Sequence, residues 1–204
     1  MWTARAEASN WAVGSLRDQA RAKSQQTAAD SLWIVCTDAV MDRALAQLWE
    51  TESPLVLRSH GGRVTEDAAP HADVPGAPER GIEYAVEQLR VHDVVVCGHS
   101  MCAGLPAELD ARRPSPTAAD ALLGRVRQRE AMNERGRRFV IEQLETLEKL
   151  PAIAAAVSER RLRVHGVFYL IESGLFTLYE RESGAFLPLH PMYDARDVQR
   201  AAAL

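Results

Sequence analysis

The sequence predicts an α/β fold in one domain: a mainly parallel four-stranded sheet with an added antiparallel edge strand and flanking helices. Three observations lead to this fold class. Short apolar segments alternate with segments of helical periodicity, which is typical of a parallel sheet with crossover helices. The apolar segments are nearly continuous, as in strands covered on both faces. The length of 204 residues is enough for one sizeable core.

Five segments are predicted to be strands. In chain order they are residues 31–38, 54–60, 93–99, 162–171 and 175–182. The first four are apolar runs separated by turn residues and helical segments, so we expect them to be parallel. Only Glu172, Ser173 and Gly174 separate the last two, a spacing typical of a hairpin, which predicts an antiparallel edge strand.

Apolar residues recur at helical spacing between these strands. The predicted helices cover residues 39–50, 80–91 and 134–150, and Pro151 ends the last of them before a short further helix. The proline-containing segment 104–123 is expected to be rich in turns. Outside the α/β domain, predicted to span residues 31–190, we expect a polar N-terminal helical arm at 1–30 and a C-terminal tail at 191–204.

The composition argues against several classes of protein. A net charge of −4 disfavours a nucleic-acid binder, which usually carries a basic excess. No apolar run reaches the length of about 18 residues that a membrane span needs, and the first residues do not read as a secretory signal. Three cysteines form no disulfide framework, and together these features predict a cytoplasmic protein without a membrane or nucleic-acid partner.

Soft metal ligands follow two of the predicted strands. The first strand ends in Cys36-Thr37-Asp38, and the third runs into His99 and Cys102. Chemistry in open α/β sheets gathers beyond the carboxyl ends of the strands, so the three side chains converge if these strands are neighbours. Two thiolates and a neutral imidazole suit a tetrahedral Zn²⁺ with one position left over.

Two other interpretations of these residues remain open. Cys97 lies inside the third strand and is expected to be a core residue. The sequence GHSMC is one residue away from the G-x-S-x-G nucleophile elbow, which would make Ser100 a nucleophile with His165 or His190 as its base. Cysteine in place of the final glycine disfavours this tight turn, and a serine hydrolase would leave Cys36 without a role.

A family resemblance supports the metal interpretation. The tripeptide CTD at 36–38, the block GIEYAVEQLRVHDVVVCGHSMCAG at 81–104, and the segment 144–184 together resemble the β-class carbonic anhydrases. The resemblance extends over roughly residues 30–187. It implies that Cys36, His99 and Cys102 bind zinc, that Asp38 orients the zinc-bound hydroxide that attacks CO₂, and that the chain forms a homodimer or a larger homo-oligomer.

The sequence departs from the family pattern at the aspartate. Residues 36–40 read CTDAV where the family reads C-S-D-S-R, so Val40 replaces the arginine that keeps the aspartate off the metal. Asp38 would then fill the fourth metal position, or another cation would hold it, with Arg43 and Arg58 nearest in sequence. An apolar Val40 would also suit a less polar electrophile such as carbon disulfide or carbonyl sulfide, and loss of catalysis would leave a zinc-stapled scaffold.

Further residues are candidates for the substrate pocket. The family's R-N-A-G-N loop reads RSHGG at 58–62, which brings His60 and Gly61 toward the site, while the double glycine after the second cysteine becomes Ala103-Gly104. Tyr84, on the helix before the ligand strand, borders the pocket according to the same resemblance. With Val40, these residues complete the predicted pocket, and its substrate is expected to be CO₂, bicarbonate or a close analogue.

Overall fold

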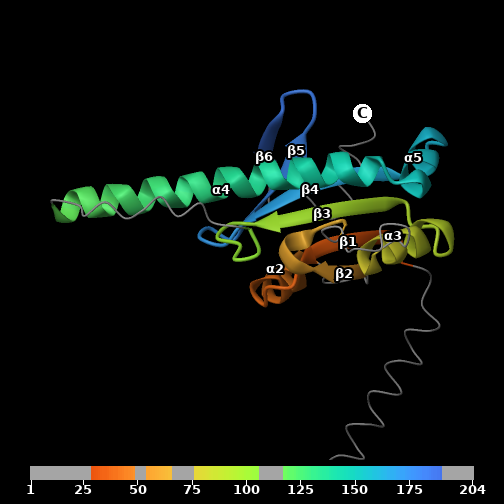
Figure 1. The fold of residues 1–204 in the computed structure, drawn as a ribbon, viewed down its shortest axis with the longest axis horizontal. Helices are drawn as coiled ribbons and strands as arrows, with labels where there is room; N and C mark the ends of the chain where they lie inside the picture. Colours follow the sequence, from red (N-terminus) through yellow and green to blue (C-terminus); the bar gives the residue numbers. More distant parts are fainter. Residues whose placement is uncertain (1–28, 49–53, 66–75, 106–116, 190–204) are drawn as a thin grey trace, which may run out of the picture.

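The computed structural model describes residues 29–48, 54–65, 76–105 and 117–189 (Figure 1). The predicted C-terminal tail at 191–204 and nearly all of the predicted N-terminal arm at 1–30 lie outside these residues. The strands are β1 (Ser31–Cys36), β2 (Leu55–Ser59), β3 (Asp93–His99), β4 (Arg163–Leu170), β5 (Leu175–Glu180) and β6 (Ala185–Pro188). The helices are α2 (Val40–Leu48), α3 (Ala77–Glu87), α4 (Ala118–Glu148) and α5 (Pro151–Ser158), with a 3-10 turn η1 (His60–Gly62).

The six strands form one mixed sheet in the order β2-β1-β3-β4-β5-β6. The first four are parallel, and β5 and β6 are added antiparallel. This confirms the predicted fold class, and it adds the short strand β6, which the sequence analysis did not include. Because β1 and β3 are neighbours, with Val35 paired to Cys97, the carboxyl ends of both strands meet at one edge of the sheet.

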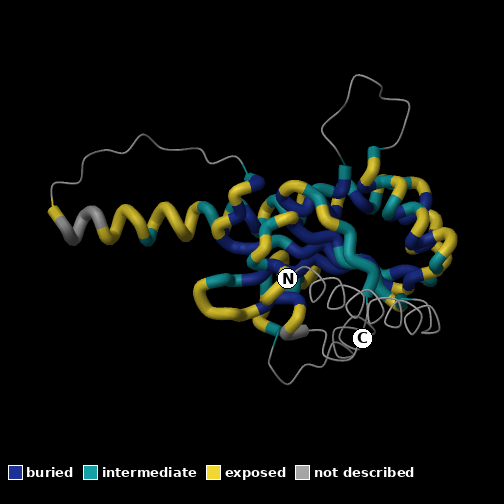
Figure 2. Tube along the Cα trace, turned by 90° about the horizontal axis from the view of Figure 1, so that it is seen from below, coloured by how far each residue is buried: buried dark blue, intermediate teal, exposed yellow. Residues whose placement is uncertain are grey.

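The sheet has an apolar cluster on each face. On one face, β1 and β3 pack against α3, α4 and α5, with Ile82, Leu144 and Ile153 fully buried or nearly so. On the other face the covering helix is α2, through Met41 and Leu45. Figure 1 shows α4 and α2 on opposite sides of the sheet, and Figure 2 shows dark blue, buried segments at the centre of the described chain. The strands are therefore covered on both faces, as their nearly continuous apolar runs predicted.

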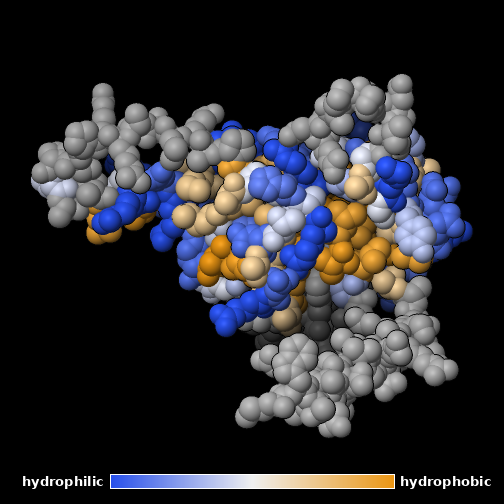
Figure 3. Space-filling model, turned by 60° about the horizontal axis from the view of Figure 1, so that its bottom comes forward, coloured by the Kyte–Doolittle hydropathy of each residue, from blue (hydrophilic) through white to orange (hydrophobic). Residues whose placement is uncertain are grey.

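Apolar surface remains on the α2 side of the sheet. Trp33, Val56 and Leu178 pack against the second cluster but are only partly buried. Figure 3, which brings the lower side of Figure 1 forward, shows orange apolar surface on this face. An apolar area of this kind on a sheet face is typical of a surface that a further layer covers.

Helix α4 corrects the sequence prediction most. It begins at Ala118, sixteen residues before the predicted start at 134, so residues 118–123 are helical and not part of a turn-rich connection. The early part of α4 consists largely of good helix formers, but it extends beyond the sheet (Figure 2), where Leu122 and Leu123 are exposed. Apolar periodicity detects only the half of the helix that faces a core, which explains the missed start.

The end of α4 agrees with the prediction that Pro151 ends this helix. The helix stops at Glu148, and Leu150 adopts an extended conformation with φ −66° and ψ 128°. A residue before proline avoids the helical region because the proline ring crowds it, and Pro151 then sits in the first turn of α5. The predicted 80–91 helix, α3, instead spans Ala77–Glu87, beginning earlier because Pro78 suits its first turn.

A buried ion cluster lies at the opposite end of the sheet from the candidate ligands. The Asp93 carboxylate, 3% exposed, accepts two hydrogen bonds from Arg163 at 2.9 and 2.8 Å and lies 2.8 Å from Nε2 of His165. Burial alone raises the pKa of Asp93, but the hydrogen bonds with His165 and Arg163 outweigh it and hold that pKa below its ordinary value. His165 is thus a buried histidine that serves the fold through Asp93.

Replacing Asp93 with asparagine is expected to destabilise the protein by about 3 kcal/mol at neutral pH, because it removes a buried carboxylate and leaves the partly buried Arg163 guanidinium without its countercharge. Since the folded-state pKa lies below the ordinary value of 3.8, the carboxylate stabilises the fold above that pH and loses its effect as the pH falls below it. Urea unfolding at pH 7 and below pH 4 measures this: the difference between the two proteins should shrink in acid. A difference that grows in acid would contradict the assignment.

Candidate metal centre

Three candidate ligands converge at the carboxyl edge of the sheet. Ligand atoms of Cys36, His99 and Cys102 all lie within 4.8 Å of one another, and all three residues are buried. Cys36 is the last residue of β1 and His99 the last of β3, while Cys102 follows on the turn after β3. The parallel pairing of β1 with β3 therefore creates the cluster from residues more than sixty positions apart.

The spacing of the two sulfurs fits a tetrahedral metal. The Sγ atoms of Cys36 and Cys102 are 3.7 Å apart, and both cysteines are free. Two thiolates bound at about 2.3 Å to one tetrahedral zinc would be separated by about 3.8 Å. The distance is too long for a disulfide and close to the separation that one tetrahedral zinc would impose on two bound thiolates.

His99 is oriented as a metal ligand. Its Nδ1 lies 2.9 Å from the carbonyl oxygen of Ser100, which fixes a proton on that nitrogen. Its Nε2 is buried and has no hydrogen-bond partner among the described residues. A buried polar atom without a partner is costly, and a lone pair on Nε2 is the donor that a zinc ion takes.

The two thiols also fit a cation electrostatically. The hydrogen bond from Cys102 lowers the pKa of the Cys36 thiol to about 3, against the opposing effect of burial. The same hydrogen bond, together with burial and the charge on Cys36, raises the pKa of Cys102. One thiolate therefore forms readily and the second does not, because two adjacent negative charges need a cation between them.

The protonation of His99 follows the same logic. Burial opposes the imidazolium, but the neighbouring Cys36 sulfur and the Ser100 carbonyl outweigh burial, so the pKa of His99 lies above its ordinary value when no cation separates the groups. A metal at this point would displace that proton and stabilise both thiolates. The donor set, its spacing and its charge thus agree with a Cys₂His zinc site.

Asp38 is held by the backbone at the start of α2. Its Oδ1 accepts a hydrogen bond from the Val40 N–H at 3.0 Å, and its own N–H donates to the Cys36 sulfur at 3.4 Å. An aspartate that caps the first turn of a helix in this way is a common local arrangement. The carboxylate therefore has a defined orientation although Val40 supplies no positive charge.

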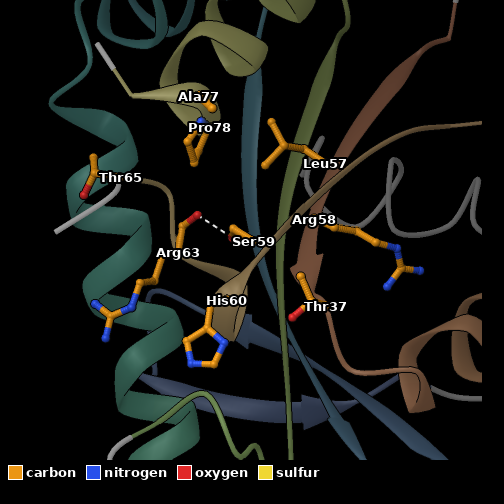
Figure 4. Close-up of a pocket in the computed structure, with 9 residues that line it drawn as sticks. All are labelled: Thr37, Leu57, Arg58, Ser59, His60, Arg63, Thr65, Ala77 and Pro78. Carbon is orange, nitrogen blue, oxygen red and sulfur yellow. Dashed lines mark hydrogen bonds between the residues drawn. The ribbon is translucent and has the colours of Figure 1, made fainter. Parts of the chain in front are cut away.

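Arg58 does not hold Asp38, contrary to one of the alternatives raised by the sequence. Its Nη1 donates to the Cys36 carbonyl oxygen at 3.0 Å, and its Nη2 pairs with the Asp42 carboxylate. In Figure 4 the Arg58 guanidinium points away from the neighbouring cleft. Among the described residues, no ion pair joins Asp38 to an arginine.

A cleft of about 490 Å³ begins one residue along the chain from Cys36, although none of the three candidate ligands lines it (Figure 4). Thr37 and His60 are part of its wall, and they neighbour the ligand Cys36 and the buried Gly61 in the chain. The remaining lining residues come from β2, the chain after η1 and the start of α3: Leu57, Arg58, Ser59, Arg63, Thr65, Ala77 and Pro78. The predicted pocket residue His60 therefore faces a cavity large enough for a small molecule.

The two glycine loops beside the site touch each other. Gly61 has φ +72°, and a Cβ added at Gly104 would lie 2.6 Å from the Gly61 nitrogen. Only a residue without a side chain fits such a backbone contact. Gly61 and Gly104, predicted as pocket residues, thus bring the turn after β2 against the turn that carries Cys102. Ala103, which lies between Cys102 and Gly104 in the chain, is exposed.

Val40 and Tyr84, two further pocket candidates, have different surroundings. Val40 is partly buried and packs against the cluster that contains Cys36 and Cys102. Tyr84 lies on α3 with 56% of its surface exposed. Within one protomer, Tyr84 therefore does not form a buried wall of the site.

The serine hydrolase alternative disagrees with the structure. Ser100 is fully buried, and its hydroxyl donates to Glu172 at 2.7 Å. His165, the first candidate base, belongs to the ion cluster with Asp93 at the other end of β4, and His190 lies outside the described residues. A nucleophile needs access to substrate and a base within hydrogen-bond reach, and the described residues give Ser100 neither.

Sequence reasoning missed one group of residues next to the site. Glu172 accepts hydrogen bonds from Ser100 and from Nδ2 of the buried Asn133, at 2.7 and 3.3 Å. The sequence analysis treated Glu172 only as part of a hairpin turn. The signal available was the lone acidic residue in that turn, but nothing local links it to a serine 72 positions earlier.

Comparisons with known proteins identify relatives of this chain. A sequence model of the family described as "Carbonic anhydrase" matches residues 31–176. A carbonic anhydrase of Pseudomonas aeruginosa is 31% identical over 198 residues, covering 86% of this chain and 88% of the relative. Carbonic anhydrase 1 of Escherichia coli O157:H7 is 29% identical over 178 residues, covering 80% of each chain.

Solved structures share the fold. The β-carbonic anhydrase CcaA superposes with a TM-score of 0.65 at 23% identity, covering 86% of this chain and 91% of that chain. One of two tetrameric β-carbonic anhydrases from Sordaria macrospora gives a TM-score of 0.58 at 23% identity, covering 84% of this chain and 96% of that chain. At this level of identity the likeness shows a common architecture.

Proposed function

Because this chain belongs to the β-carbonic anhydrase family, we propose that it hydrates CO₂ to bicarbonate at a zinc ion held by Cys36, His99 and Cys102. The observation that carries the proposal is the convergence of two sulfurs 3.7 Å apart with a buried, unpartnered imidazole nitrogen. Zinc bound there supplies a Lewis acid that lowers the pKa of water to about 7 and so provides hydroxide at neutral pH.

The residues around the ligands have defined parts in this reaction. The two thiolates offset the charge of the cation, and the Ser100 carbonyl keeps His99 in the tautomer that leaves Nε2 free. Asp38 orients the reacting water by accepting its hydrogen bond, while the Val40 N–H keeps the carboxylate in place. The backbone at the start of α2 thus takes over part of the role that the family assigns to an arginine.

Asp38 has a second candidate role as a fourth zinc ligand. The carboxylate is held by one backbone hydrogen bond and by no arginine among the described residues, so little opposes its movement toward a cation. A closed Cys₂His-Asp centre would bind metal tightly and exclude water. The substitution Val40→Arg separates the two roles, because a cation at position 40 would hold Asp38 away from the metal.

The alternative substrates are carbon disulfide and carbonyl sulfide. The observation that favours them is Val40, an apolar side chain packed against the ligand cluster where the family has a charged one. An apolar wall disfavours the developing charge of bicarbonate but suits a less polar electrophile with the same linear shape. A non-catalytic zinc-stapled scaffold is the remaining alternative, and the loss of the arginine favours it as well.

Stopped-flow CO₂ hydration by the zinc-loaded protein tests the proposal. We expect hydration above the uncatalysed rate, a fall of about 10²-fold in kcat for Asp38→Asn because the neutral amide keeps the helix cap but loses the acceptor charge, and a rise of about 10-fold for Val40→Arg. The asparagine variant is expected to fold like the parent, since its side-chain oxygen still accepts the hydrogen bond from the Val40 N–H. The fall in kcat would then report the lost charge and not a disturbed fold.

The proposal would be overturned if the zinc-loaded protein hydrates CO₂ no faster than the uncatalysed reaction. Release of hydrogen sulfide from carbonyl sulfide or carbon disulfide would then assign the alternative substrate class. If neither reaction occurs and Val40→Arg creates CO₂ hydration, the chain is a diverged scaffold. An active parent excludes the scaffold directly.

The proposed assembly is a homodimer or a larger homo-oligomer. The partly buried apolar side chains on the α2 side of the sheet support a second copy as the covering layer, and a relative of the same fold is tetrameric. Sedimentation velocity on the full chain measures the oligomeric state.

None of the helices in the described part of the chain has the length and apolar character to cross a bilayer.

A further inference from the structure

Ser100 lies between two of the candidate ligands and is fully buried. Each of its polar groups has a partner. Its N–H donates to the Tyr169 carbonyl at 2.8 Å, its carbonyl oxygen lies 2.9 Å from Nδ1 of His99, and its hydroxyl donates to Glu172 at 2.7 Å and accepts from the Ile171 N–H at 2.9 Å. The residue therefore ties the ligand turn to the end of β4 and to the turn that follows.

The turn that Ser100 anchors is strained. Met101, the next residue, has φ +58°, a left-handed conformation that costs a non-glycine residue roughly 1 kcal/mol, and its side chain is 48% exposed. Cys102 follows directly. A strained residue between two ligands persists only when its surroundings hold it, and the hydrogen bonds of Ser100 are the contacts available on the N-terminal side.

Glu172 connects Ser100 to helix α4. Oε2 of Glu172 accepts from Ser100, whereas Oε1 accepts from Nδ2 of Asn133 at 3.3 Å and lies 3.8 Å from Nε of Arg129. Burial alone raises the pKa of Glu172, but its backbone N–H, Ser100, Asn133 and Arg129 outweigh burial and lower it, so the carboxylate is ionised at neutral pH. A charged acceptor makes the bond from Ser100 a strong one.

We propose that Ser100 is a positioning residue for the metal centre, acting with Glu172. The pair holds the carbonyl that orients His99 and the strained turn that presents Cys102, so that the two ligands are in place before the metal arrives. This role rests on the proposed zinc site and not on the reaction that the zinc catalyses. The positioning role also explains why a hydroxyl is present at position 100, although Ser100 is fully buried and has no access to substrate.

Metal retention by the full-length Ser100→Ala protein tests this role. The alanine removes the hydroxyl that donates to Oε2 of Glu172 and accepts from the Ile171 N–H, which releases the turn. We therefore expect zinc to dissociate about 10- to 100-fold faster into a chromogenic chelator. Glu172→Gln, on a partly exposed turn, removes the charge and keeps an acceptor. We expect it to accelerate release by a smaller factor in the same direction.

The absorption spectrum of the Co²⁺-substituted protein is a second measurement, and a general loss of stability does not change it. The d–d and sulfur-to-cobalt bands report the ligand geometry directly, and we expect them to shift or broaden in Ser100→Ala. Asp93→Asn is the matched control, because Asp93 is also buried, and its hydrogen bonds with Arg163 and His165 lie at the opposite end of the sheet from the ligand turn. It should lower the Tm but leave the bands and the zinc release rate unchanged.

The outcomes separate this role from the proposed reaction. Equal zinc release from the parent, Ser100→Ala and Glu172→Gln would overturn the positioning role even if the parent hydrates CO₂. Faster release from both variants would support it even if the parent is inactive. Accelerated release from Asp93→Asn as well would reduce the effect to general destabilisation and also overturn the proposal. A parent that binds neither metal would overturn it together with the zinc site.

Discussion

The substitution Cys102→Ser is expected to weaken zinc binding by about 10³-fold and to abolish catalysis. Structural zinc sites contribute about 10–16 kcal/mol, so removal of one of three protein ligands costs about 4 kcal/mol, which corresponds to that factor. Serine keeps nearly the same size, but its hydroxyl does not ionise near neutral pH and is a poor ligand for zinc. The loss therefore reports coordination and not packing.

Metal analysis of purified protein and competition with a chelator measure this effect. The parent is expected to hold about one zinc per chain, and Cys102→Ser well under a tenth of that after dialysis against chelator. Cys97→Ser is the matched control, because Cys97 is fully buried in β3 and burial raises the pKa of its thiol, but it is not part of the ligand cluster. It should lose stability and keep its zinc.

Undiminished zinc in Cys102→Ser would contradict the assignment of the metal centre. Equal loss in Cys97→Ser and Cys102→Ser would show that the fold and not the ligand had been disturbed. A parent without zinc after expression in zinc-supplemented medium would remove the basis of the proposed function, since no other described residues offer a comparable cluster.

The second large effect is expected for Gly104→Ala, which should destabilise the protein by about 3 kcal/mol, near the upper end of typical overpacking costs. The added methyl would lie 2.6 Å from the nitrogen and 2.7 Å from the Cα of Gly61, and both are backbone atoms that no rotamer change can move. The two loops must separate, and with them Cys102 and the backbone beside Cys36. Zinc affinity should fall together with stability.

Gly124→Ala is the control with the opposite sign. Gly124 lies in the exposed part of α4, where an added Cβ meets nothing within 4 Å, so alanine should stabilise by about 0.5–1 kcal/mol through helix propensity. Thermal unfolding of the two variants with zinc in excess measures both effects. A Gly104→Ala protein as stable as the parent would mean that the two loops are not in contact in solution.

Much of the architecture was available from the sequence. Continuous apolar runs mark the parallel strands because both of their faces are covered, and Glu172-Ser173-Gly174 marks the hairpin, in which Gly174 has φ +69°. The candidate ligands Cys36, His99 and Cys102 were predicted because they are chemically distinctive and follow strand ends. These features depend on local composition, which a sequence displays directly.

Other features depend on residues that meet only in the folded chain. The first half of α4 lacks the apolar stripe that reveals a core-facing helix, and β6 is four residues long at an edge, so neither gives a strong pattern. The partner of Arg58 was left open by the sequence, because sequence offset alone does not show whether Asp38 or Asp42 lies within reach of a guanidinium.

The sequence by itself determined which candidate ligands are present, that they follow the carboxyl ends of two strands, and that position 40 lacks the family's arginine. Only the tertiary structure decided that these side chains converge, through the pairing of β1 with β3, and that the Ser100–Glu172 pair lies behind His99. The physical reason is that ligand identity is a property of single residues. Hydrogen bonds between residues 72 positions apart exist only after the strands have paired.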